Sequence, residues 1–368
     1  MTPGIGIAAL SVAFPSVVRR NDHFVSHTPE LVEQAHARTL ARVFSNDGTP
    51  QSIFDRAMAR HESDPFRGAV ERRVLARDED GLGLELAAAR EALASVHCAP
   101  ADIDTLISVG FLSRDIGIGN AVHLAKALGL RGNAWNLESA CGGPLQAMQV
   151  ARALIASEQA RRVLVTTSCT YSARADPRDS LGWFLGDGAG AFLVGRVEPS
   201  SGIVGAYARH TADTCGTWYH ALEADDAGAR IVMRASAATG RVMRASAQPH
   251  LVECCHGALA DAGLALDDID CFVPHTPTAW FADFAAQALG FPRERTIDTY
   301  PAYANVGPAL TPANLHRAVA SGRLRPGDTA LVFGPGSASS AAAVVLRWSD
   351  APVTAHGCAL PGDAPLPS

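Results

Sequence analysis

Residues 92–109, ALASVHCAPADIDTLISV, and residues 258–273, ALADAGLALDDIDCFV, contain the same two motifs in the same order. Ala-Leu-Ala begins at 92 and 258, and Asp-Ile-Asp begins at 102 and 268 (258 − 92 = 268 − 102 = 166). An apolar run follows in each copy, and such a run predicts a buried β-strand. Short matches arise by chance in an alanine-rich chain, but two matches at one offset favour an internal duplication.

The order of elements downstream is also the same in both halves. A predicted helix ends in Ala-Leu-Gly at 127–129 and 288–290, a second helix covers 151–155 and 317–320, and apolar runs follow at 163–166 and 330–333. Strands that are apolar throughout are covered by helices on both faces. The sequence therefore predicts an α/β protein made of two duplicated halves, residues 1–200 and 201–349.

Three segments fall outside the repeat. Residues 21–67 form an insertion with a predicted helix at 29–44. Residues 211–248 contain Val-Met-Arg-Ala-Ser-Ala twice, which indicates either a functional pair of arginines or a hairpin or two turns around Gly240. Insertions of this kind usually roof or line a pocket. Residues 350–368 are rich in proline and alanine, and we expect a flexible tail there.

Composition excludes several classes of protein. Of the 368 residues, 48% are hydrophobic and 18% are charged, which is enough apolar material for a sizeable core. The net charge of −6 argues against a nucleic-acid partner and against a basic membrane-binding patch. No apolar run reaches the roughly 20 residues of a membrane span, and the first residues do not resemble a signal peptide. We therefore expect a cytoplasmic protein with no membrane partner.

The chain has eight cysteines, and most of them lie within apolar runs, where a free cysteine behaves as a small buried side chain. A chain of this length does not need disulfides for its stability. Neither a CxxC nor an HExxH motif occurs in the sequence. We expect no metal site and no cofactor.

Cys141 stands apart from the other cysteines. Residues 137–144 read LESACGGP and precede a helical pattern at 145–156. Small neighbours leave the sulfur accessible, a helix N-terminus favours the thiolate, and the glycines leave backbone N–H groups for an oxyanion. A buried cysteine ahead of a helix is the commoner arrangement, but this context favours a nucleophile.

His275 and Asn305 are the second and third candidate residues. His275 follows the apolar run 271–274, at the end of a predicted strand, where α/β proteins handle their ligands. Asn305 precedes a predicted helix at 310–320, a position that also suits a simple turn or helix cap. The offset of the repeat places Asn305 near the second-half counterpart of Cys141.

Together these motifs resemble the β-ketoacyl-acyl-carrier-protein synthase III group of the thiolase superfamily. The similarity covers residues 68–348. The matching motifs are Glu71-Arg72-Arg73, Ala140-Cys141-Gly142-Gly143, Gly186–Gly190, Pro274-His275, Ala304-Asn305-Val306-Gly307 and Phe333-Gly334-Pro335-Gly336. The resemblance implies a thiolase-like five-layer αβαβα fold. It also implies a homodimer whose sheet continues across the twofold axis, and we expect strand 163–167 at that edge.

The resemblance further implies a chemistry for these residues. Cys141 would accept an acyl group from an acyl-carrier protein or from coenzyme A, and His275 and Asn305 would act on the second substrate. The backbone N–H groups of Cys141 and of Gly336 or Ser337 would hold the oxyanion. The substrate pocket is expected to include Thr276, Trp280 and Gly307.

Some positions differ from the fatty-acid enzymes of that group. They read His-Gln-Ala-Asn where this chain reads His275-Thr276-Pro277-Thr278, and they carry a carrier-docking arginine where it has Ala279-Trp280-Phe281. These changes resemble the branch in antibiotic biosynthesis that moves an acyl group onto a hydroxyl or amine. We therefore expect acyl transfer to a small-molecule acceptor. Decarboxylative Claisen condensation is the alternative, and an inactive scaffold partner of a synthase is the third hypothesis.

Overall fold

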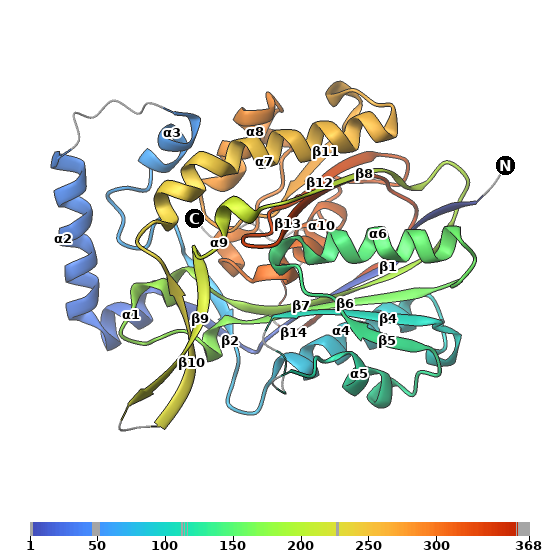
Figure 1. The fold of residues 1–368 in the computed structure, drawn as a ribbon, viewed down its shortest axis with the longest axis horizontal. Coiled ribbons are helices and arrows are strands. Elements are labelled where there is room, and N and C mark those ends of the chain that lie inside the picture. Colours follow the sequence, from blue (N-terminus) through green and yellow to red (C-terminus); the bar gives the residue numbers. More distant parts are fainter. Residues whose placement is uncertain are drawn as a thin grey trace.

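The computed structural model describes residues 3–45, 52–111, 113, 115, 117–225, 228–357 and 359. Two β-sheets face each other with a pair of helices between them, and further helices cover both outer faces (Figure 1). This is the five-layer αβαβα arrangement expected from the sequence. None of the helices in the described ranges is long and apolar enough to cross a membrane.

The first sheet has six strands and the second has four. The first has the order β14 (Val353–Gly357), β1 (Gly4–Phe14), β7 (Asp187–Val197), β6 (Val163–Thr170), β4 (Thr105–Phe111) and β5 (Asn133–Asn136). The second has the order β11 (Cys271–Pro274), β12 (Thr329–Gly334), β13 (Ser340–Arg347) and β8 (Gly202–His210). All four strands expected from the apolar runs are present.

The two sheets repeat one topology, which confirms the duplication. In the order β4-β6-β7-β1 the first pair is parallel and the others are antiparallel, and the order β11-β12-β13-β8 has the same pattern. The first residues of β4 and β11, and those of β6 and β12, differ by the same 166 positions as the sequence motifs (271 − 105 = 329 − 163).

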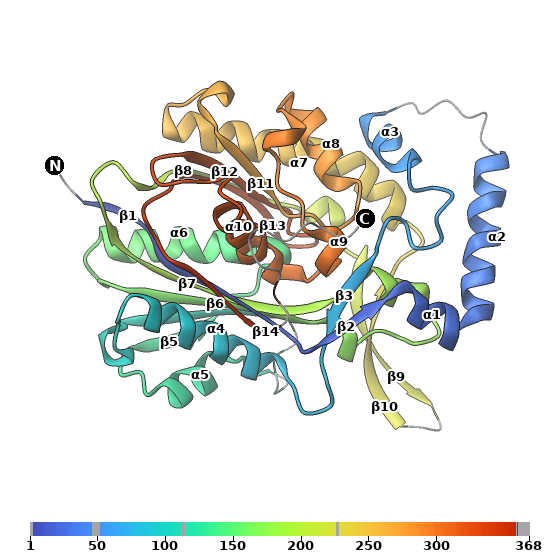
Figure 2. The same cartoon turned by 180° about the vertical axis from the view of Figure 1, so that it is seen from behind.

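Helices fill three layers. The central layer holds α6 (Gly143–Ala156) and α10 (Leu310–Ala320). The outer layers hold α4 (Gly81–Ser95) and α5 (Ala121–Leu128) on the first sheet and α7 (Thr239–Ala262) and α8 (Phe281–Leu289) on the second (Figures 1 and 2). The central helices have apolar residues around much of their circumference because both of their sides contact a sheet.

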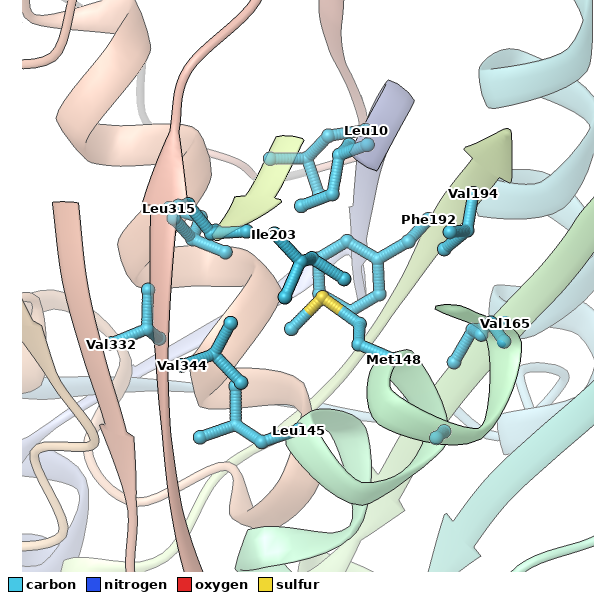
Figure 3. Packing of buried hydrophobic residues seen from close by; sticks show 14 of the residues in the cluster. Leu10, Leu145, Met148, Val165, Phe192, Val194, Ile203, Leu315, Val332 and Val344 are labelled. Carbon is cyan, nitrogen blue, oxygen red and sulfur yellow. The ribbon is translucent and has the colours of Figure 1, made fainter. Parts of the chain in front are cut away.

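The largest apolar cluster lies between the sheets. Leu145 and Met148 of α6 meet Phe192 of β7 on one side and Val344 of β13 on the other, and all four are fully buried (Figure 3). At roughly 25 cal/mol per Å² of apolar surface, burial of this kind is the main force that joins the halves. The position of α6 is thus fixed from both sheets.

Two insertions extend beyond the layers. The first, residues 21–67, contains α1 (Asn21–His27), α2 (Pro29–Ser45) and α3 (Ile53–Ala59), and it confirms the helix expected at 29–44. The paired strands β2 (Val17–Arg20) and β3 (Glu71–Val74) flank it. In it, Phe54 of α3 contacts Trp280 and Phe284 of the α8 region, with ring centroids 4.4 and 5.5 Å apart. The second insertion is the hairpin of β9 (Trp218–Asp225) and β10 (Gly228–Ala235).

Three expectations about local structure were wrong. The tail is not flexible from residue 350 onward, because Val353–Gly357 form β14, which pairs with β1. The hairpin does not turn at Gly240, because the first Val-Met-Arg repeat lies in β10 and the second lies in α7. Residues 163–167 are not at a sheet edge, because β6 lies between β4 and β7, and its apolar character reflects that interior place.

A homodimer with a continuous sheet stays a prediction, and its edge must be another strand. The strands at the two edges of the first sheet are β5 and β14. An unpaired edge exposes N–H and C=O groups that a second copy can pair. We expect one of these two strands at the interface and a dimer by static light scattering at micromolar concentration. A monomer there would contradict the prediction.

A buried carboxylate ties α4 to the first sheet. Glu85 of α4 accepts hydrogen bonds from Ser108, Asn120, Thr166 and Ser168 at 2.5 to 2.9 Å. Glu85→Ala would leave these donors without their acceptor, and each unsatisfied buried donor costs about 1–3 kcal/mol. We expect the free energy of unfolding to fall by about 3 kcal/mol or more in urea titrations.

Glu91→Ala is the matched control for this variant, because Glu91 is exposed on the same helix. A surface change of this kind is expected to alter the free energy of unfolding by about 0.5 kcal/mol or less. An equal effect of both variants would show that the Glu85 network does not stabilise the fold.

Candidate active site

Cys141 lies in a sharp turn at the start of the central helix α6. It is the middle residue of a 3-10 turn, Ala140–Gly142, and α6 begins at the next residue. Ala140 has φ +46°, a left-handed conformation that alanine rarely adopts. Gly142 must be a glycine because a Cβ atom there would lie 2.2 Å from the carbonyl oxygen of Ser340. The turn therefore brings the cysteine against the second sheet.

Asn305 occupies a similar turn ahead of the other central helix, α10. Ala304 has φ +56°, and Asn305 is held by two backbone hydrogen bonds, to Phe184 O at 3.0 Å and from Gly186 N at 2.9 Å. Its side-chain Oδ1 accepts a hydrogen bond from Gly307 N at 2.9 Å. Since the oxygen is engaged in this way, the Nδ2 group is left as the available donor.

His275 follows directly after β11, as the sequence predicted. The side chain is buried, and its ring interacts with the side chain of Asn305. Burial lowers the pKa of His275 to about 3, and the Asn305 side chain acts in the opposite direction. The imidazole is therefore neutral at physiological pH, with one ring nitrogen that donates and one that accepts.

The backbone between the two halves brings these residues together. The N–H of His275 donates to Phe333 O at 2.7 Å, at the end of β12. The next residue, Gly334, lies so close to the cysteine turn that a Cβ on it would be 3.2 Å from Cys141 O. The candidate nucleophile and the candidate histidine thus flank the same strand end.

The loop after β12 is fixed by hydroxyl groups from the 3-10 turn and loop before β9. Thr211 Oγ1 hydrogen-bonds to Gly336 O, and Thr214 Oγ1 accepts from Ala338 N at 2.6 Å. Ser337 Oγ lies 3.2 Å from Thr217 Oγ1. Held in this way, the Gly336-Ser337 backbone has the rigidity that an oxyanion site requires, and its role as one stays a prediction.

The expectation that the helix N-terminus keeps Cys141 as a thiolate is wrong. Although part of the residue is exposed, the surrounding protein desolvates the thiol and raises the pKa of Cys141 to about 12. Hydrogen bonding with Tyr171 and with the cysteine's own backbone N–H lowers this pKa, but burial outweighs both. The resting form is the thiol.

Tyr171 is the residue of this site that the sequence analysis missed. Its hydroxyl interacts with both Cys141 and Cys169, and its ring is buried. Gly307 packs against Cys169 and Tyr171, since a Cβ on it would lie 2.8 Å from Cys169 Sγ and 3.3 Å from Tyr171 Oη. The one available signal was its place directly after β6, where strand ends meet the site.

The three residues expected in the substrate pocket lie in different places. Gly307 lies at the site, beside Tyr171 and Cys169. Thr276 is buried and lies within hydrogen-bond distance of Asn314 Nδ2, at 3.3 Å, so it supports the strand end that precedes the site. Trp280 packs against Phe54 of the inserted helix α3 and against the outer apolar cluster, and its place in the substrate pocket stays a prediction.

No group of three or more His, Cys, Asp or Glu side chains gathers as a metal site would require, as far as the described residues extend.

Comparisons with known proteins agree with this arrangement. Residues 135–213 match the family model for 3-oxoacyl-[acyl-carrier-protein] synthase III, and residues 259–348 match the model for the C-terminal part of the same enzymes. Among solved structures, the synthase III of Thermus thermophilus has 27% identity and a TM-score of 0.76, over 94% of this chain and 99% of that one. A priming β-ketosynthase from the R1128 polyketide pathway has 23% identity and a TM-score of 0.76, over 96% and 98%.

Similarity to curated relatives extends over most of the chain. The β-ketoacyl-[acyl-carrier-protein] synthase III of Mesorhizobium japonicum is 30% identical over 300 residues, which cover 76% of this chain and 88% of the relative. The enzyme of the same name from Cereibacter sphaeroides is 33% identical over 288 residues, which cover 77% and 88%. Fold, motifs and similarity therefore agree that this chain belongs to the β-ketoacyl-acyl-carrier-protein synthase III family of acyl-transferring enzymes.

Proposed function

We propose that this protein is a decarboxylative condensing enzyme that loads an acyl group onto Cys141 and extends it with a malonyl-type thioester. The donor is an acyl thioester of a carrier protein or of coenzyme A. The observation that carries the proposal is the pairing of a neutral imidazole at His275 with the side-chain amide of Asn305, whose Oδ1 is held by Gly307 N and whose Nδ2 group can donate.

In the first half-reaction, Cys141 sulfur attacks the thioester carbonyl. The bond to the donor sulfur breaks, the thiol proton leaves with the departing thiol, and the acyl group stays on the enzyme. Because the resting cysteine is protonated, proton loss is part of this step. The Tyr171 hydroxyl and the Cys141 backbone N–H favour the anionic sulfur while the proton is lost.

In the second half-reaction, the malonyl-type thioester loses carbon dioxide. The resulting enolate carbon attacks the acyl carbonyl, and the Cys141–acyl bond breaks to release a β-ketoacyl thioester. The Cys141 sulfur leaves as a thiolate and takes a proton from solvent, which restores the resting thiol. His275 and Asn305 would each donate a hydrogen bond to the enolate oxygen. Donors of this kind must be fixed and desolvated before charge develops on the oxygen, and the burial of His275 meets that condition.

Acyl transfer to a hydroxyl or amine is the second candidate. The sequence favours it through Thr276-Pro277-Thr278, which replaces the residues that usually follow the histidine. Transfer needs His275 as a general base, and a base works best when its pKa lies near the working pH. The low pKa of His275, about 3, therefore favours its use as a hydrogen-bond donor, and condensation becomes our first choice.

The two candidates predict different effects of the same variants. For condensation, His275→Ala and Asn305→Ala should each lower the rate of the second half-reaction by about 10²–10³-fold, because each removes one enolate donor. Carbon dioxide should appear in step with product. The measurement is carbon dioxide release together with intact-protein mass, after loading with acetyl-CoA and addition of malonyl-CoA or malonyl carrier protein.

Cys141→Ala is the control for loading, and it should show no acyl adduct. Both donor variants should still form the adduct, since they act after loading. Transfer is the correct function if product forms without carbon dioxide, if His275→Ala stops turnover, and if Asn305→Ala retains most of it.

A second prediction concerns activation of the nucleophile. Tyr171→Phe removes the hydroxyl that lowers the pKa of Cys141, so this pKa should rise. At a fixed pH below it, less thiolate is present, and alkylation of Cys141 by iodoacetamide should be slower. The pH profile of the alkylation rate should shift to higher pH.

Tyr219→Phe is the matched control, because Tyr219 is an exposed tyrosine on the neighbouring hairpin. Its profile should overlay that of the wild type. An unchanged profile for Tyr171→Phe would show that the hydroxyl does not act on Cys141.

A further inference from the structure

Arg174, near the active site, differs from the arginines around it in its interactions with carboxylates. Arg178, Arg230 and Arg234 all lie within 4.0 Å of Asp176, at 3.1, 3.8 and 2.8 Å. Arg174 forms no ion pair with any carboxylate in the described ranges, and its Nε atom is shielded from solvent without a hydrogen-bond partner. Its guanidinium is therefore a partly desolvated cation with an unused donor.

His220 presents a second unused polar atom beside it. The residue lies on β9 directly opposite Met233 on β10, and Met233 N donates to Arg174 O at 3.1 Å. The Nε2 atom of His220 is buried and has no partner among the described residues. Burial and then the charge of Arg174 lower the pKa of His220, so the ring is neutral and donates when its proton is on Nε2.

A chain of contacts links these two residues to the nucleophile. Arg174 follows Tyr171 by one 3-10 turn, with Arg174 N bonded to Tyr171 O at 2.9 Å, and the Tyr171 hydroxyl interacts with Cys141. The ring of Phe111 lies between those of Tyr171 and His220, with its centroid 5.9 Å from that of Tyr171 and 6.0 Å from that of His220.

The side chains that pack around Tyr171 are apolar. Cys169, Leu185 and Met233 form one buried cluster with it. Apolar side chains of this kind suit contact with the methylene groups of an acyl chain, whereas the two unpartnered donors require an acceptor. A buried donor without an acceptor costs free energy, and a carboxylate can satisfy an arginine and a histidine together.

We propose that Arg174 and His220 form a subsite for a carboxylate at the far end of the acyl group that Cys141 accepts. The substrate class is then the half-thioester of a dicarboxylic acid. The inference rests on the proposed loading of Cys141, and it applies to condensation and to acyl transfer alike, because both begin with that step.

The test compares acidic with neutral acyl chains of equal length. N-acetylcysteamine thioesters carry no phosphate, so succinyl, glutaryl and adipoyl thioesters are set against butyryl, valeryl and hexanoyl thioesters. The rate of acylation of Cys141 is followed by intact-protein mass. We expect the wild type to favour at least one acidic chain by about tenfold or more, the effect of a hydrogen bond to a charged group.

Arg174→Gln should abolish this preference and leave the rates for neutral chains within about twofold of the wild type. Arg178→Gln is the matched control, since Arg178 lies in the same loop but is exposed and paired with Asp176, and it should retain the preference. The proposal is overturned if the wild type has no preference for acidic chains, or if Arg174→Gln keeps it. It is also overturned if Arg174 matters only for coenzyme A thioesters, which would indicate a phosphate contact.

Failure of every thioester to label Cys141 would count against the proposed function and not against the subsite. Binding is then measured without turnover, by the thermal stability of the protein with glutarate or with glutaramide. Glutarate alone should raise the melting temperature of the wild type, and it should not raise that of Arg174→Gln. Equal behaviour of the two compounds, or of the two proteins, would overturn the subsite.

Discussion

The burial of α6 and α10 between two sheets is the constraint on which the rest of the structure depends. Most residues of both helices are buried or half-buried, so neither helix can shift without opening the main apolar core. Their N-terminal turns are therefore fixed relative to one another. Because Cys141 precedes one helix and Asn305 precedes the other, the packing of the core also sets the geometry of the site.

The same packing stabilises the strained backbone conformations at this site. Left-handed alanines precede Cys141 and Asn305, and a conformation of this kind costs roughly 1–3 kcal/mol at each residue. Backbone hydrogen bonds from the neighbouring strands and loops hold the second turn, and close contact with Ser340 holds the first. Duplication thus placed two similar turns face to face, and the two copies now carry different side chains, a cysteine in one and an asparagine in the other.

Much of the fold could be predicted because its strands are apolar and repeat at one offset. Cys141, His275 and Asn305 could be named because each stands at an element boundary with small or rigid neighbours. Tyr171 also follows directly after a strand, but it belongs to no motif of the sequence, and its contact with Cys141 joins residues thirty positions apart in the chain. The pKa of Cys141 was also beyond prediction, since the extent of its burial depends on segments far apart in sequence.

The strand β14 has a consequence for how this protein can be shortened. Of residues 353–357 only Val353 and Thr354 favour a strand, and the segment becomes one because β1 offers it a row of unsatisfied backbone groups. A chain cut after Asp350 would leave β1, a long and largely apolar strand, as an open edge. Such an edge recruits other chains, so low solubility of the shortened protein would reflect sheet-edge aggregation and not loss of the folded core.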